Sequence, residues 1–158
     1  MLKAFDLFPL WVAHTGLGIA MRKSTLLFPA IEVMHVLGLT LLLGSILATN
    51  LRLFGVGMRR QSVPEVAVGL SPMFWTGLAT TIITGVIMFV GEPMKCFDNE
   101  AFWWKMGLLA TAVVYHLTIF QGVSRSDRIG PVLQRSVAVA SLTLWFGVGV
   151  AGRVIGFI

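Results

Sequence analysis

Charged side chains are scarce in this chain of 158 residues, and their scarcity limits the class of protein it can be. Only 12% of the residues are charged, whereas soluble domains carry about 25%. Hydrophobic residues make up 56% of the sequence, and the mean hydropathy is +0.86. This composition excludes a soluble globular domain and predicts an integral membrane protein.

Cysteine is nearly absent as well, with Cys96 as the single example. One cysteine excludes an intrachain disulfide. The sequence also has no glycine-rich phosphate loop, no nucleophile elbow, no C-x-x-C pair and no ligand spacing of a zinc site. These absences favour an electron carrier or an accessory subunit over an enzyme, and we predict no catalytic residue.

The chain does contain long apolar stretches, which run over residues 26–54, 66–90, 101–123 and 133–157. A membrane span needs about 20 predominantly apolar residues, and each stretch exceeds that length. Inside lipid the backbone must satisfy its own hydrogen bonds, which runs of this length achieve as helices. We therefore predict an all-α fold in which one domain, residues 1–158, forms a bundle of four transmembrane helices.

Residues 1–23 precede the first span and mix apolar with polar side chains, such as Trp11 with His14 and Arg22. That pattern is typical of an amphipathic helix that lies in the membrane interface. Pro9 is expected to bend or break such a helix. We predict an interfacial helical segment ahead of the bundle.

The net charge of +5 comes from basic residues that flank the spans and do not form one patch. Lipid headgroups are therefore the expected partners, and nucleic acid is not. Arginines outnumber acids in the connections after the first and third spans, while acids outnumber lysine in the connection between the second and third. The positive-inside rule then predicts that both termini lie outside the cytoplasm, which for a protein of the bacterial inner membrane is the periplasm. The residues compared are Arg52, Arg59 and Arg60 against Glu65, then Arg125, Arg128 and Arg135 against Asp127, and Lys95 against Glu92, Asp98 and Glu100.

Five ionisable residues lie within the spans or at their edges: Glu32, His35, Lys105, His116 and Arg153. An uncompensated charge near the bilayer midplane costs at least ~2.5–3.5 kcal/mol, so such residues usually have partners. A rise of ~1.5 Å per residue places His116 nearer the cytoplasm and the other four in one outer layer. Glu32 and His35 are also i and i+3 on one helix face. We predict a cofactor site formed by these residues.

Haem b is one cofactor that histidines in a membrane bundle bind, and His35 and His116 are the candidate metal ligands. Ligation by both needs two imidazoles at one level, whereas their predicted depths differ by about 9 Å. A site with one histidine, or with a histidine and a methionine, is left open. The structural alternative is an ion pair that fixes helix packing, with Lys105 and Arg153 extending to headgroups and His116 packed as a core residue.

The second span carries a set of threonines and glycines among its apolar residues. Small residues let helix backbones approach closely, and threonines form hydrogen bonds within or between helices. We predict a packing face here, with a quinone headgroup in contact with Thr80 or Thr84 as the alternative. The residues of this face are Thr76, Gly77, Thr80, Thr81, Thr84 and Gly85.

Several short motifs stand out together, among them Phe28-Pro29-x-x-Glu32-x-x-His35, Leu51-Arg52-Leu53-Phe54-Gly55 and Gly152-Arg153. On these motifs the chain resembles an uncharacterised bacterial family of short four-helix integral membrane proteins. The resemblance implies a bundle of four transmembrane helices, and it implies no established activity. In that family an asparagine and a later histidine are more frequent where this chain has Tyr115 and Ile119, so His116 departs from the family pattern. A looser likeness, carried by the apolar run that follows His35, connects the chain to copper-resistance and b-type cytochrome membrane bundles.

Three functions follow as hypotheses. The leading one is a redox-associated subunit or electron-transfer partner that binds haem b or a quinone, with Glu32 and His35 at its centre and Lys105 and Arg153 balancing negative charge. The second is a non-catalytic accessory or assembly subunit that packs against other membrane subunits or against copies of itself. The third is a small metal-handling or transport protein.

Overall fold

The computed structural model describes residues 7–58, 60–126 and 129–155. Within these ranges the chain is helical and has no strand, and four helical segments are long and apolar enough to cross a membrane. The predicted all-α fold with four membrane-spanning helices is therefore confirmed. The segments are α3 (Leu27–Leu53), α4 (Val63–Gly91), α8 (Pro131–Val154), and a continuous run of α6 (Glu100–Tyr115), η2 (His116–Phe120) and α7 (Gln121–Ser124).

Two helix starts differ from the predicted ones by more than one residue, because polar and proline residues fix them. The second span starts at Val63, three residues early, where Ser62 and Glu65 form a capping box: the Ser62 backbone N–H donates to the Glu65 carboxylate at 2.7 Å. The fourth starts at Pro131, whose missing N–H costs nothing in a first turn. Predictions that fall on Met1–Asp6, Arg59, Asp127, Arg128 and the end of the fourth span at Phe157 lie outside the described residues.

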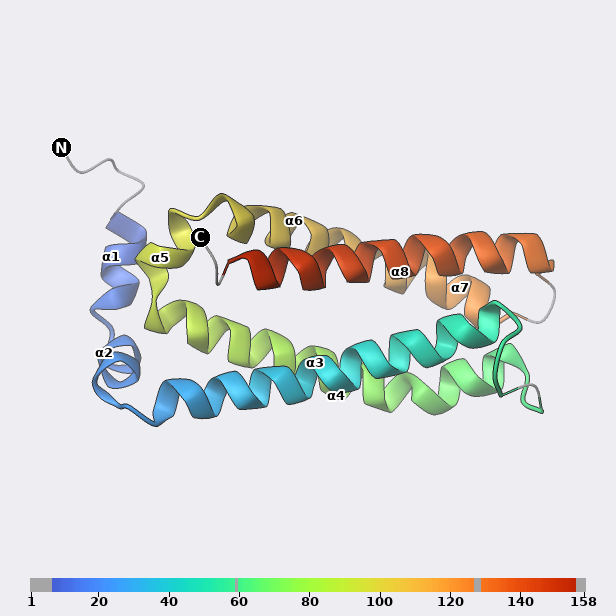
Figure 1. The fold of residues 1–158 in the computed structure, drawn as a ribbon, viewed down its shortest axis with the longest axis horizontal. Coiled ribbons are helices and arrows are strands. Elements are labelled where there is room, and N and C mark those ends of the chain that lie inside the picture. The colour runs from blue at the N-terminus through green and yellow to red at the C-terminus, as the bar shows by residue number, and fades with distance from the viewer. Residues whose placement is uncertain (1–6, 59, 127–128, 156–158) are drawn as a thin grey trace.

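The long helices form two antiparallel pairs that lie along each other (Figure 1). Helix α3 packs mainly on α4, and α6 packs mainly on α8. The first pair crosses at glycines: a Cβ added to Gly77 would lie 2.5 Å from the Leu42 backbone nitrogen and 2.9 Å from the Gly38 carbonyl oxygen. No side chain fits in that space, so the glycines permit the close approach of the two backbones.

One hydrophobic cluster joins the two pairs at the middle of the bundle. It combines residues of α3, α4, α6 and α8, and its central aromatic side chains, Phe74 and Trp145, meet edge to face with ring centroids 6.3 Å apart. The cluster divides the interior into two ends, one beside α1, α2 and α5 (Pro93–Phe97) and one beside α7. Its buried members are Leu42, Ile46, Phe74, Leu78, Ala112, Trp145 and Val148.

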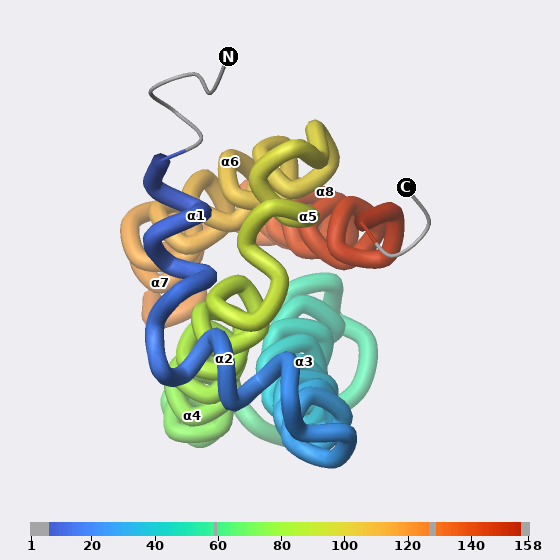
Figure 2. Tube along the Cα trace, turned by 90° about the vertical axis from the view of Figure 1, so that its left-hand side faces the viewer, coloured from blue at the N-terminus to red at the C-terminus, as the bar shows by residue number. Residues whose placement is uncertain are grey.

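The N-terminal segment forms two short helices, α1 (Leu7–Ala13) and α2 (Gly16–Lys23), instead of one bent helix. Thr15 separates them because its hydroxyl caps the start of α2 by accepting from the Gly18 N–H at 3.3 Å. The two helices lie across one end of the bundle (Figure 2). Arg22 ties them there, since its guanidinium donates to the Gly91 carbonyl at the end of α4 (3.2 Å) and to the Ala13 carbonyl at the end of α1.

Candidate functional site

His35 faces α4 and is held there by a hydrogen bond. Its Nδ1 lies 2.8 Å from the Thr84 hydroxyl oxygen. The Thr84 hydroxyl donates its own hydrogen to the Thr80 carbonyl at 2.6 Å, so its oxygen accepts from the ring. The proton of a neutral imidazole is thereby placed on Nδ1, and Nε2 keeps its lone pair.

Lys105 of α6 reaches the same end of the bundle. Its side chain lies over Gly152 of α8, where an added Cβ would be 3.4 Å from Cε and 3.6 Å from Nζ. The Lys105 charge acts on both the His35 imidazole and the Cys96 thiol. The structure therefore brings an imidazole from α3 and an ammonium group from α6 to the same end of the bundle.

Glu32 and Arg153 are placed differently. The Glu32 side chain is exposed, and among the described residues it forms no ion pair or hydrogen bond. Arg153 is also exposed and lines an apolar groove between α3 and α8. The predicted layer of four ionisable residues is thus reduced to His35 and Lys105 in the bundle, with the other two side chains at its surface.

His116 lies at the opposite end of the bundle and is only 6% exposed. Its ring stacks on Phe74 of α4, with centroids 3.8 Å apart and planes 9° apart, and on Phe120 at 4.8 Å. His116 is also the first residue of the π-helical segment η2. Such segments are rare inside α-helices and frequently occur at functional sites.

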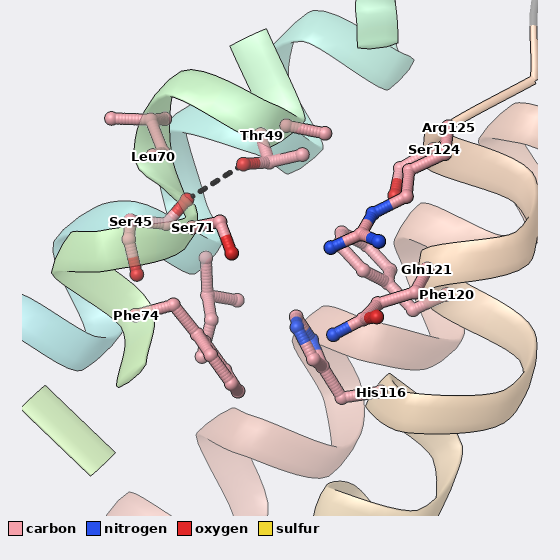
Figure 3. A pocket seen from close by; sticks show the side chains of 12 residues that line it. Ser45, Thr49, Leu70, Ser71, Phe74, His116, Phe120, Gln121, Ser124 and Arg125 are labelled. Atoms are coloured by element: carbon pink, nitrogen blue, oxygen red, sulfur yellow. Dashed lines mark hydrogen bonds between the residues drawn. The ribbon is translucent and has the colours of Figure 1, made fainter. Parts of the chain in front are cut away.

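A small cavity of about 20 Å³ opens beside this imidazole (Figure 3). That volume is sufficient for one water molecule. The His116 Nδ1 has no hydrogen-bond partner, and the guanidinium of Arg125, the C-cap residue of α7, is directed toward the ring (Figure 3). The lining residues are Ser45, Ile46, Thr49, Ala67, Leu70, Ser71, Phe74, His116, Phe120, Gln121, Ser124 and Arg125.

The two histidines do not form a pair of ligands for one metal. His35 contacts Thr84 and His116 contacts Phe74, and these α4 residues are ten positions apart, which corresponds to ~15 Å along the helix. The described residues also contain no group of three or more His, Cys, Asp or Glu side chains that could hold a metal ion. Any haem or metal on this chain would take one histidine ligand at most from this pair.

Sequence reasoning did not find the cavity beside His116, although a signal for it was present. Ser45, Thr49 and Asn50 are buried polar residues on one face of the otherwise apolar α3. Polar residues at i, i+4 and i+5 of a membrane span mark an interior polar surface. Gln121 and Arg125, one turn apart on the far side of the cavity, continue that surface.

Comparison with known proteins gives one match. A family model described as a family of unknown function (DUF6644) matches residues 11–158. No curated protein and no solved structure matches the chain. The match agrees with the resemblance drawn from the motifs around Glu32, His35 and Arg153.

Proposed function

We propose that this chain, which belongs to the family of unknown function DUF6644, is a redox-associated subunit of a bacterial inner-membrane complex that binds the headgroup of a quinone at His35. One observation carries the proposal: Thr84 fixes the ring proton on Nδ1, which leaves the His35 Nε2 as a hydrogen-bond acceptor beside a cationic side chain. A hydroquinone has two hydroxyl groups. One can donate a hydrogen bond to the His35 Nε2, and the oxygen of a hydroxyl that loses its proton is stabilised by the positive charge of Lys105.

A bound quinone would supply the electron transfer, and the chain's own residues would position its oxygens. The His35 Nε2 would accept a hydrogen bond from one hydroxyl of the reduced headgroup and would be the group that takes its proton. The Lys105 ammonium would donate to an oxygen of the headgroup and would stabilise negative charge there. Thr84 acts through His35, because its hydroxyl holds the ring in the tautomer and orientation that this contact needs.

Haem b is the second candidate cofactor, and the same hydrogen bond favours it. Histidines that bind a metal usually donate their other ring N–H to a hydroxyl, carbonyl or carboxylate, as His35 does to Thr84. Lys105 would then balance a haem propionate. A quinone is the better fit because it needs no second protein ligand at the level of His35, whereas a six-coordinate haem does.

The test is to purify the full chain in a mild detergent and measure bound quinone by extraction, together with a reduced-minus-oxidised spectrum. We expect saturable binding of a short-chain benzoquinone that is lost in His35→Ala and kept in His14→Ala, an exposed histidine. A Soret band that disappears in His35→Ala would assign haem b in place of a quinone. Neither cofactor bound to folded wild-type protein would refute the redox function.

An accessory or assembly role is a second candidate function, and an apolar groove supports it. The groove lies between α3 and α8, has a volume of about 370 Å³, and is lined by residues that include Leu47, Phe146 and Val150. Phe146 is 74% exposed. Another membrane subunit seated in this groove would cover it, and stoichiometric partners after native purification, with no cofactor in this chain, would favour this role.

The periplasmic position of both termini belongs to the same proposal. It places the His35 end of the bundle and α5 on the periplasmic side and Arg125 on the cytoplasmic side. Cys96 in α5 is a natural reporter because it is the single cysteine and is partly exposed. In intact spheroplasts, a membrane-impermeant maleimide should label Cys96, and labelling only after lysis would reverse the orientation.

A further inference from the structure

We propose that the cavity beside His116 is a binding site for a single small monovalent anion of about the size of a halide. The site lies at the α7 end of the bundle, beyond the hydrophobic cluster from His35, so it does not rest on the proposed quinone function. It is carried by three features: the donors that converge on the cavity, the charge at its mouth and its size.

Hydrogen-bond donors converge on this cavity from three elements, α4, η2 and α7 with its C-cap residue. The Gln121 amide enters from α7, the Arg125 guanidinium enters from the C-cap of that helix, and the Ser71 hydroxyl enters from α4 (Figure 3). The ring of His116 is directed into the same space, and its buried Nδ1 has no partner. Groups that donate hydrogen bonds around one point favour an anion at that point.

The α3 residues that line the cavity do not donate hydrogen bonds into it. The Ser45 hydroxyl donates to the Leu42 carbonyl at 2.8 Å, and the Thr49 hydroxyl donates to the Ser45 carbonyl at 2.9 Å. Their hydrogens are therefore directed to their own helix. The donors available to a ligand come from α4, η2 and α7.

The positive charge at the cavity is that of Arg125, which is exposed at the mouth. No carboxylate is among the residues that line it, and within the described ranges Arg125 forms no salt bridge. The stacked rings of Phe74 and Phe120 on either side of His116 exclude water from part of the wall, which strengthens electrostatic interactions inside. An anion requires the tautomer of His116 that carries its proton on Nδ1, and it also gains the attraction of the Arg125 guanidinium, which a water molecule does not.

The volume of about 20 Å³ sets the size of the ligand. A cavity of that volume holds one particle of about the size of a water molecule. Chloride or bromide therefore fits, while a phosphate group with four oxygens is too large to enter the inner cavity. A lipid headgroup would reach Arg125 at the mouth without displacing a halide from His116.

Chloride-35 NMR line broadening on the purified full chain in a neutral detergent tests this proposal, with gluconate holding the ionic strength constant. We expect saturable broadening that bromide competes away, and that is lost in Arg125→Gln and reduced at least severalfold in His116→Phe. The matched control is Arg135→Gln, which removes the same charge from an exposed position of α8 and should leave the broadening unchanged.

Two other outcomes would overturn the site. Absence of saturable broadening would mean that the cavity holds water only. Equal broadening in wild type and Arg125→Gln would mean non-specific association with a basic protein. A further arm adds phosphatidylglycerol or phosphatidylcholine in nanodiscs: chloride binding that survives both lipids supports a halide site, and binding abolished by phosphatidylglycerol alone assigns Arg125 to a lipid phosphate and rejects the halide.

Discussion

The two ends of the bundle each hold one histidine, and the surroundings of the two rings differ. At the α2 end, the His35 Nδ1 is bound to a threonine on the neighbouring helix at 2.8 Å, next to a crossing where glycines bring the backbones together. At the α7 end, His116 is held by ring stacking, its Nδ1 is unpaired, and a cavity lies beside it. Hydrogen bonding thus fixes one imidazole, and shape fixes the other.

This contrast separates two uses of a buried polar group. A ring whose proton is placed by a partner presents one defined nitrogen and suits recognition of a hydrogen-bonding ligand. A ring with an unsatisfied nitrogen carries an energetic cost that a small ligand can remove. The predictions below test the contrast from its largest consequence to its smallest.

The largest effect is expected at the crossing of α3 and α4. In Gly77→Ala the new methyl group would overlap the Leu42 backbone, so the helices must separate and the His35–Thr84 contact must loosen. We expect a loss of about 3 kcal/mol in the free energy of unfolding, measured by denaturant titration in detergent. Gly69→Ala in the same helix is the control: it has open space around it and should not destabilise. Equal effects of the two changes would show that the crossing is not tight.

Removal of the partner of His35 should have the next largest effect. Thr84→Val keeps the shape of the side chain but leaves the Nδ1–H without its acceptor. We expect a loss of about 1–2 kcal/mol and weaker quinone binding. The control is Thr76→Val, since Thr76 is exposed on the same helix. An unchanged stability in Thr84→Val would mean that the hydrogen bond does not hold the ring.

The same substitution at the two histidines should give opposite signs. His35→Phe breaks a hydrogen bond and should destabilise by about 1 kcal/mol. His116→Phe removes an unpaired buried nitrogen while keeping the aromatic stack, and in chloride-free buffer it should stabilise by up to about 1 kcal/mol. Thermal unfolding of both variants measures the difference. If the two variants were destabilised to the same extent, the two histidines would not differ in how they are held.

The smallest effect concerns the thiol of Cys96 at the α5 corner. Burial and then the nearby Glu92 carboxylate raise the pKa of this thiol, while Lys105 and Lys95 oppose the shift. A raised pKa leaves less thiolate at neutral pH, so alkylation should be slow and should accelerate only in alkaline buffer. Glu92→Gln removes the acidic contribution and should speed alkylation at a given pH. Lys105→Met should slow it, and an opposite response would place Lys105 away from this corner.

The sequence predicts helix number and the packing face of α4 because those features depend on composition. Gly77, Thr81 and Thr84 are small or polar residues among large apolar ones, and the structure buries all three. The face of α3 that turns toward the bundle was not predictable in this way. Residues around Glu32 that face outward are as hydrophobic as the buried Leu42, so an amphipathic pattern is missing and the exposed face cannot be read from it.

The surroundings of His116 could not be predicted for a different reason. An α-helical period places each side chain of the third span on a known face, but the π-helical turn at residues 116–120 changes that period. The stack of His116 between Phe74 and Phe120 depends on this change. The sequence of the turn contains no proline or glycine that would indicate it.

Arg22 has a consequence for the order in which the molecule is completed. Its guanidinium bonds the Gly91 carbonyl, 69 residues later in the chain. Ribosomes add ~5–20 residues per second, so this acceptor emerges only several seconds after the donor. Until then the first two short helices lack their main docking surface, which α4 and α5 provide, and this end of the bundle is closed only after helix α4 has been synthesised.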